Sequence, residues 1–299
     1  MRIHDVHCHF FSRRFFETLG GQMKPPPDDP ARSLPERLGW EAPGEPEQLA
    51  ARWIEELDRH HVSRAALIAS VPGDEDSVAA AVARHPHRFV GFFMVDPTRD
   101  DAVERVRRGL KELKLRTVCL FPAMQRYTVQ DPRAMKVFEE AATHPGASVF
   151  VHCGLLSVGV RAKLGLPSPF DINCGNPLLL HPVANAFPKL PIIIPHLGAG
   201  LFREALMVAD LCPNILFDTS SSNSWLKYNP GFTLRRILRK AIEVLGPDRV
   251  LFGTDSSFFP RGWQSAIYDT QRRVLQDLSM DPEKFFHGNF ERLFGPIVV

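Results

Sequence analysis

The sequence lacks any apolar run near the roughly 18 residues that a membrane-spanning helix needs, and it opens without an apolar leader. It also lacks a long block of charge of one sign, since 36 basic and 34 acidic residues are interspersed and give a net charge of +2. These absences argue against membrane insertion, export and a nucleic-acid-binding surface. We therefore expect a cytoplasmic protein whose partner is a small-molecule substrate, with no nucleic acid and no membrane.

Cysteine is scarce as well, with five in 299 residues and no C-x-x-C pair among them. A scattered, odd-numbered set argues against a disulfide framework or a zinc ribbon and fits a reducing compartment. No G-x-S-x-G segment surrounds a serine, which argues against a serine nucleophile. Ser220 to Ser222 could still hydrogen-bond a ligand.

What the sequence does contain is a series of short apolar runs. Their near-continuous hydrophobicity is typical of parallel strands that are buried on both faces, so we predict eight such strands. The runs span residues 2–10, 64–70, 89–95, 117–121, 148–153, 191–197, 214–220 and 249–255.

Helical patterns lie between these runs, and several begin with a polar residue followed by proline, as at Asp131, Asn176 and Asp281. Eight alternating units predict an α/β fold, a (β/α)8 TIM barrel forming a single domain over 1–299 with a C-terminal helical extension. The segment 20–46 is rich in proline and glycine and predicts a long loop excursion after the first strand, a candidate lid. Residues 154–176 predict a second rim loop.

Histidines and one aspartate stand at the ends of several runs. Side chains two apart on a strand face the same side, so His7 and His9 both point into a barrel. His152, His196 and Asp255 end later runs, and the carboxyl ends of parallel strands meet at one mouth. Inward polar groups of this kind are unfavourable without a metal, so a metal site is predicted there.

Four motifs make the chain similar to a known family: HDVHCHF, VFVHCG, PHLG, and FGTD followed by GNFERLF. The chain resembles the amidohydrolase-2 branch of the amidohydrolase superfamily, near aminocarboxymuconate-semialdehyde decarboxylase and related metal-dependent hydrolases. The resemblance implies that His7, His9, His152 and Asp255 hold the metal. It also implies that His196 works beside the metal as a catalytic residue together with Asp255.

The resemblance bears on metal number and identity too. Many relatives carry a lysine on the fourth strand that bridges two metals, whereas Cys119 stands at that place here, which implies one divalent metal. Zn²⁺ is the expected ion, with Mn²⁺, Fe²⁺ or Co²⁺ as alternatives, because this ligand set suits all of them. Relatives of this architecture are often dimers or larger, so a homodimer is one expectation.

Two reactions fit this site. A divalent metal with an open position lowers the pKa of a bound water toward ~7, which predicts a hydrolase acting on a small carboxylated, cyclic or aromatic-derived substrate. The alternative is a metal-dependent non-oxidative decarboxylase (carboxy-lyase), and a lesser one is a non-catalytic binding barrel. Some decarboxylating relatives replace the first histidine of H-x-H with glutamate, and its retention at His7 favours hydrolysis slightly.

Other residues near the predicted mouth of the barrel are also candidates for a functional role. Asp5 shares the inward face of the first strand and either orients a ligand imidazole or is a polar residue of the barrel core. Cys8 and Cys153 point outward and are excluded as ligands. Substrate contacts are predicted in the loops after the strands, where arginine can bind a carboxylate and aromatic rings can stack on a flat substrate: Arg161, Trp225, Phe258, Arg261 and Trp263.

Overall fold

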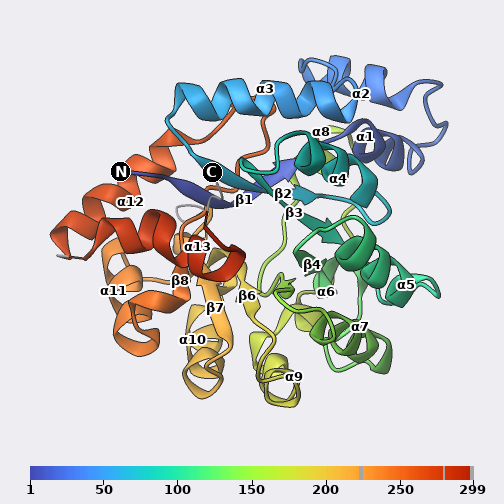
Figure 1. The fold of residues 1–299 in the computed structure, drawn as a ribbon. Coiled ribbons are helices and arrows are strands. Elements are labelled where there is room, and N and C mark those ends of the chain that lie inside the picture. The colour runs from blue at the N-terminus through green and yellow to red at the C-terminus, as the bar shows by residue number, and fades with distance from the viewer. Residues whose placement is uncertain (222–224, 279, 297–299) are drawn as a thin grey trace.

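The computed structural model describes residues 1–221, 225–278 and 280–296. Eight parallel strands follow one another in sequence order around a barrel, with helices on the outside (Figure 1). Each strand lies inside one of the predicted apolar runs, so the predicted (β/α)8 barrel is confirmed. The strands are β1 (His4–Phe10), β2 (Arg64–Ala69), β3 (Phe89–Met94), β4 (Thr117–Leu120), β5 (Ser148–Val151), β6 (Ile192–Ile194), β7 (Ile215–Asp218) and β8 (Val250–Leu251).

The chain beyond β8 closes the barrel against β1. The N–H of Val6 donates to the carbonyl of Phe252 at 2.9 Å, and the N–H of Asp255 donates to the carbonyl of His7 at 3.0 Å. Cys8 also forms a parallel bridge with Ser256. The closure therefore places Asp255 beside the β1 histidines.

Helices connect the strands, and the predicted proline-marked starts are confirmed. The side chain of Asp131 accepts the N–H of Arg133, Asn176 opens a 3-10 turn that leads into a helix, and Asp281 accepts the N–H of Glu283. The helices are α1 (Arg13–Gly20), α2 (Pro30–Leu38), α3 (Pro46–Arg59), α4 (Glu75–Arg84), α5 (Ala102–Arg107), α6 (Pro122–Gln125), α7 (Pro132–Ala142), α8 (Gly159–Lys163), α9 (Leu180–Ala186), α10 (Phe202–Leu211), α11 (Leu234–Leu245), α12 (Ser265–Asp277) and α13 (Asn289–Phe294). No helix in the described part of the chain is long and apolar enough to cross a membrane.

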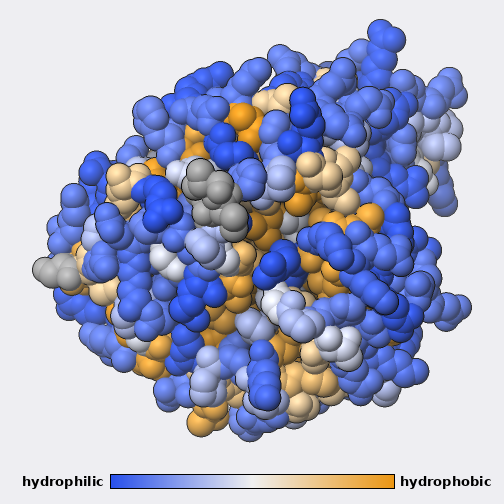
Figure 2. Space-filling view, viewed as in Figure 1, coloured by the Kyte–Doolittle hydropathy of each residue, from blue (hydrophilic) through white to orange (hydrophobic). Residues whose placement is uncertain are grey.

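The core has an inner and an outer layer. The inner cluster fills the barrel with residues such as Phe92, Cys119 and Phe150, and the α13 residues Phe290 and Phe294 pack onto it. The predicted C-terminal helical extension therefore covers one end of the barrel. Figure 2 shows this face, where hydrophobic residues are visible in the hollows between largely hydrophilic helices. The outer cluster lies between strands and helices and contains Cys8 and Cys153, as the strand alternation predicts.

The segment 20–46 is not a plain loop, because it contains α2. Proline at the first helical position fits a helix, since its missing N–H would be unpaired there, and Pro30 occupies that position. Leu34 of α2 packs with Phe15 of α1 and with Val160 and Leu164 from the second rim segment. Figure 1 shows α1, α2 and α8 together on one side of the barrel. Of these helices, α1 and α8 contribute to one wall of the pocket described below, and α2 packs behind them.

Candidate metal centre

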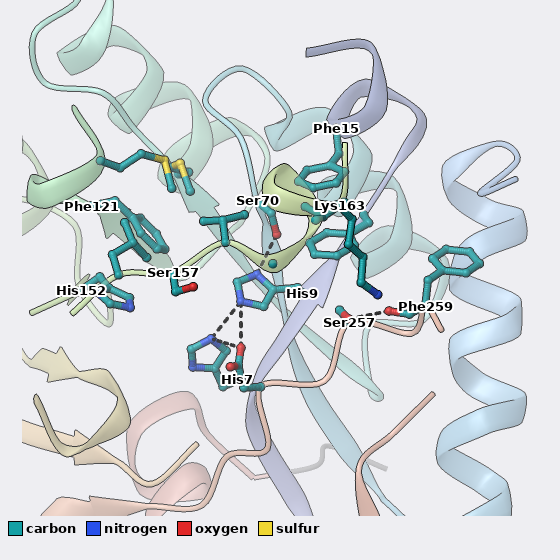
Figure 3. Close-up of a pocket in the computed structure, with 18 of the residues that line it drawn as sticks. His7, His9, Phe15, Ser70, Phe121, His152, Ser157, Lys163, Ser257 and Phe259 are labelled. Carbon is teal, nitrogen blue, oxygen red and sulfur yellow. Dashed lines mark hydrogen bonds and ion pairs between the residues drawn. The ribbon is translucent and has the colours of Figure 1, made fainter. Parts of the chain in front are cut away.

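Three side chains converge where β1 meets the segment after β8. Nε2 of His7 lies 3.3 Å from Nε2 of His9, and Oδ1 of Asp255 lies 3.1 Å from Nε2 of His9 and 3.5 Å from Nε2 of His7. Within the described residues, these three form the one group of histidine, cysteine and acidic side chains whose ligand atoms all lie within 4.8 Å of one another. In Figure 3, His7 and His9 sit together at the base of the pocket.

The hydrogen bonds behind the two β1 rings decide which nitrogen faces the cluster with a lone pair. Nδ1 of His7 lies 2.6 Å from Oδ2 of Asp218, and a carboxylate can only accept, so Nδ1 carries the hydrogen. Nδ1 of His9 lies 2.8 Å from the hydroxyl of Ser70, which donates its own hydrogen to the carbonyl of Ile68. That hydroxyl therefore accepts from His9, so in the neutral form of both rings Nε2 is the nitrogen that carries the lone pair.

In their neutral forms the two rings present lone pairs at Nε2 beside the carboxylate of Asp255. Three electron-pair donors at this spacing are stabilised when a cation lies among them. Ligand atoms placed tetrahedrally around zinc at its usual bond lengths lie about 3.3 Å apart, which agrees with the observed spacings. The donor set fits one divalent metal.

His152 and His196 lie next to this cluster. The ring of His196 is 5.0 Å from that of His7 and 5.1 Å from that of His152, measured between centroids. Nδ1 of His152 is buried without a hydrogen-bond partner among the described residues. His152 is not part of the three-residue group, so its assignment as a fourth ligand stays a prediction.

His196 is held by the chain after β7. Its Nδ1 lies 3.1 Å from the carbonyl oxygen of Ser220 and 2.9 Å from the Ser220 hydroxyl. Because a carbonyl only accepts, Nδ1 donates and Nε2 keeps its lone pair. Burial lowers the pKa of His196 and lowers that of His152 strongly, which favours the neutral rings. His196 is therefore arranged to accept a proton at Nε2.

The backbone leaves the extended conformation at both predicted catalytic residues. His196 has φ +55° and Asp255 has φ +64°, in the left-handed region that non-glycine residues rarely adopt. Both residues lie past the ends of their strands, in turns, rather than inside the predicted strands 191–197 and 249–255. Burial would raise the pKa of Asp255, but the side chain of His9 and the other nearby histidines lower it, so the carboxyl is ionised.

A pocket of about 320 Å³ opens above these residues. Figure 3 shows His152 and Phe121 on one side of it and Lys163 and Phe259 on the other. Its walls are mostly apolar, and two cations, Lys163 and Arg261, lie among them. The apolar walls are Phe11, Phe15, Trp40, Met94, Phe121, Met124, Leu156, Val158, Val160, Phe259 and Pro260.

Only some of the residues that were predicted to contact substrate line this pocket. Arg261 lines it, whereas Trp225 lines a neighbouring pocket. Arg161 lies outside the wall, because its guanidinium donates to the carbonyl of Pro167 and to the side chain of Gln22. These two hydrogen bonds hold it within its own rim segment and against the end of α1.

Two aromatic residues that were predicted to contact substrate also lie outside the wall of this pocket. Phe258 packs on Trp53 of α3 at 5.4 Å between ring centroids and is not in the pocket wall, where its neighbour Phe259 lies instead. Trp263 is buried, and its Nε1 donates to Asp5 at 2.7 Å. Both rings therefore stabilise the loop after β8 from behind.

Asp5 also has a different role from the hypothesis that it orients an imidazole. It accepts from the N–H and hydroxyl of Thr254, from the N–H of His7 and from the Trp263 indole. It is a buried polar residue that fixes the chain beside Asp255. Burial raises its pKa to about 6, against the lowering effect of these hydrogen bonds.

Sequence reasoning missed the residues that support the ligands. Asp218 and Ser70 hold the two β1 rings, and Lys163 supplies a pocket cation. Asp218 lies near the end of the predicted strand 214–220 and is the last residue of β7, so its place near a strand end was an available signal. Of the serines proposed to bind a ligand, Ser220 bonds to His7 and His196, while Ser222 lies outside the described residues.

The chain belongs to the amidohydrolase family, whose model matches residues 4–295. Enzymes of this family bind a divalent metal. The structure is also similar to solved structures at sequence identities that show a common fold. One is 5-carboxyvanillate decarboxylase from Sphingomonas paucimobilis, with 18% identity and a TM-score of 0.67 over 98% of both chains.

Two further structures add to this group. A 5-carboxyvanillate decarboxylase from Novosphingobium aromaticivorans is complexed with manganese and 4-hydroxy-3-methoxy-5-nitrobenzoic acid; it shares 17% identity, with a TM-score of 0.66 over 98% of this chain and 95% of the other. A protein from Acinetobacter baumannii described as a probable 2-pyrone-4,6-dicarboxylic acid hydrolase has citric acid bound; it shares 15% identity, with a TM-score of 0.64 over 99% and 100% of the chains. Two decarboxylases and a protein described as a probable hydrolase therefore share this fold.

Proposed function

We propose that the protein is a metal-dependent hydrolase that acts on a small, cyclic or aromatic-derived compound carrying a carboxylate. The observation that carries this proposal is the convergence of three electron-pair donors, from His7, His9 and Asp255, at the base of an apolar pocket. His152 is proposed as the fourth ligand. The ion proposed is Zn²⁺, with Mn²⁺ as the main alternative because a structural neighbour contains manganese.

The chemistry supplied by a divalent cation at this place is Lewis acidity, which makes water a stronger nucleophile at neutral pH. Side chains of the protein accept the protons that the reaction releases. His196 presents Nε2 toward the pocket and accepts the proton of the attacking water, while the Ser220 carbonyl holds its other nitrogen. The ionised carboxylate of Asp255 offers a second proton acceptor.

The pocket supports a flat, anionic substrate. Aromatic side chains such as Phe121 and Phe259 provide surfaces for a planar ring, and the apolar walls exclude water from it. Lys163 and Arg261 can bind a carboxylate, and neither forms an ion pair with a described residue. Two of the structural neighbours are named after a carboxylated ring compound, 5-carboxyvanillate in one and 2-pyrone-4,6-dicarboxylic acid in the other, which agrees with this substrate class.

A second candidate is a carboxy-lyase on the same site, which the decarboxylases among the neighbours favour. In that reaction the C–C bond to the carboxylate breaks, CO2 leaves, and the ring carbon takes a proton from a protonated His196. Apolar walls would assist this step because they remove water from the carboxylate that must lose its charge.

One experiment separates the two candidates. Purified protein reconstituted with Zn²⁺ or Mn²⁺ is assayed against lactones and aromatic amides, and against aromatic and muconate-type carboxylic acids with CO2 measured. We expect hydrolysis products without CO2, and a loss of at least about 100-fold in kcat for His196→Gln. The exposed His87→Gln is the matched control. CO2 release would replace the hydrolase with the carboxy-lyase, and no turnover of either group would refute both.

A further inference from the structure

A second pocket meets the same catalytic residues from another side. It has a volume of about 550 Å³ and shares five lining residues with the first pocket: His152, Leu156, Ser157, His196 and Asp255. The rest of its lining is separate, from the chain after β5, β6 and β7: Leu155, Ala199, Ser221, Trp225, Lys227 and Tyr228. The two cavities therefore meet over His196 and Asp255, where the proposed reaction takes place.

The wall between the two pockets is built from the chain after β5. Leu156 and Ser157 line both pockets. The preceding residues are anchored, because the N–H of Leu155 donates to the carbonyl of Ala199 and the N–H of Gly154 donates to the carbonyl of Gly175. A Cβ at Gly154 would overlap the carbonyl oxygen of Gly198, so glycine is required for this close approach. The wall between the two pockets is thus a fixed feature of the site.

The second pocket contains a buried hydrogen-bond donor that lacks an acceptor among the described residues. Trp225 is only 3% exposed, and its indole N–H has no hydrogen-bond partner in the described residues. An indole N–H only donates, and buried donors are almost always paired. Lys227 lines the same pocket with its ammonium over the Tyr228 ring, and Asp255 is the one carboxylate among the described lining residues. This chemistry fits a ligand group that accepts hydrogen bonds and carries negative charge.

We infer that the substrate has two parts: a planar acyl group in the first pocket and a leaving group bearing a carboxylate in the second. This inference rests on the proposed hydrolase function and names its substrate class, an amide or ester of a carboxylated amine or alcohol. Water adds its OH to the acyl carbon, the C–N or C–O bond breaks, and the leaving nitrogen or oxygen takes the remaining proton. A decarboxylation releases only CO2 and gives the second pocket no such occupant.

The test measures binding separately from turnover. Calorimetric titration of the metal-loaded protein uses 4-hydroxybenzoate as the planar part and glycine as the carboxylated leaving group. We expect both to bind at once, so that saturating 4-hydroxybenzoate leaves the Kd of glycine within about twofold. Trp225→Phe, which keeps an aromatic ring but removes the indole N–H, should raise the Kd of glycine about fivefold or more. Lys163→Met should weaken 4-hydroxybenzoate instead.

Several results would overturn the two-part substrate. These are mutual competition between the two ligands, the absence of glycine binding to the wild type, or an unchanged Kd for glycine in Trp225→Phe. Turnover is then read separately by comparing N-(4-hydroxybenzoyl)glycine with N-methyl-4-hydroxybenzamide. A preference of at least about tenfold in kcat/KM for the glycine conjugate supports the inference, and equal values contradict it. Absence of hydrolysis with both ligands bound together refutes the hydrolase function and not the second binding site.

Discussion

Nδ1 of His7 lies 2.6 Å from Oδ2 of Asp218, so a carboxylate at the end of β7 fixes the ring of a histidine on β1. The other oxygen of Asp218 accepts the N–H of Ser220, also at 2.6 Å. Both oxygens are therefore committed to N–H donors, in a fully buried place. The pair turns Nε2 of His7 toward His9 and Asp255, which is the orientation that a metal ligand needs.

Replacing Asp218 by asparagine should weaken the site without removing a ligand. An amide has one accepting oxygen, so its NH2 group would face either the His7 ring or the Ser220 N–H, and the negative charge behind the imidazole would be lost. We expect a metal affinity about 10- to 100-fold lower in Asp218→Asn, measured by titration against a competing chelator. Asp277→Asn, an exposed substitution, serves as the control. Equal affinities in the two variants would show that Asp218 does not support the metal.

The ligand assignment itself predicts a loss of bound metal. Asp255→Ala removes one of the three converging atoms, and His152→Ala removes the proposed fourth ligand. We expect elemental analysis to find about one equivalent of metal in the wild type and well under half of that in both variants. His87→Ala, at an exposed position, should retain the wild-type amount. Near-stoichiometric metal in His152→Ala alone would restrict the ligands to the three converging residues.

The strand pattern could be predicted because most of the barrel strands are apolar on both faces, a local property of the sequence. The same is true of His7 and His9, which two-residue alternation places on one face. The exact strand ends could not be predicted. The strand ends depend on tertiary contacts, such as the hydrogen bond from the N–H of Asp255 to the carbonyl of His7. Regular strand pairing has stopped there, because the backbone of Asp255 adopts a positive φ.

The residues that hold the metal-ligand side chains in place could not be identified from local sequence patterns either. Asp218 and His7 are 211 residues apart, and only the closure of the barrel brings them into contact. The positions of Arg161 and Phe258 outside the first pocket could not be predicted for a related reason. A sequence shows that a residue lies in a rim loop, but the packing against Gln22 and Trp53 decides whether its side chain turns into the pocket.

A pH dependence of stability should come from Asp74, whose side chain accepts from the Ser12 hydroxyl at 2.6 Å. Burial raises its pKa from 3.8 to about 7. The folded state therefore holds a proton between about pH 4 and 7 that the unfolded state has released, so stability falls as the pH rises through this window. We expect the Asp74 contribution to the wild-type free energy of unfolding to be on the order of 2 kcal/mol smaller at pH 8 than at pH 5.

The matched variants for this effect are Asp74→Asn and the exposed Asp100→Asn. Asparagine cannot ionise, so Asp74→Asn should show a smaller decrease in stability between pH 5 and 8 than the wild type, as measured by urea denaturation. Asp100→Asn should keep the wild-type dependence. An unchanged slope in Asp74→Asn would mean that this carboxyl is already ionised at pH 5 in the folded protein.

Two glycines with similar backbone angles should respond very differently to alanine. Gly154 has φ +75° and Gly165 has φ +71°, so each substitution carries the strain of a left-handed residue, roughly 1 kcal/mol. A Cβ at Gly165 meets open space, whereas at Gly154 it overlaps backbone oxygens of Gly198 and Ala199. Urea denaturation should therefore show Gly154→Ala to be destabilised by about 2 kcal/mol more than Gly165→Ala. Gly154→Ala should also lose activity, because the wall between the two pockets must move. Equal destabilisation of the two variants would mean that the Gly154 to Gly198 approach adds nothing to stability and that the wall can shift freely.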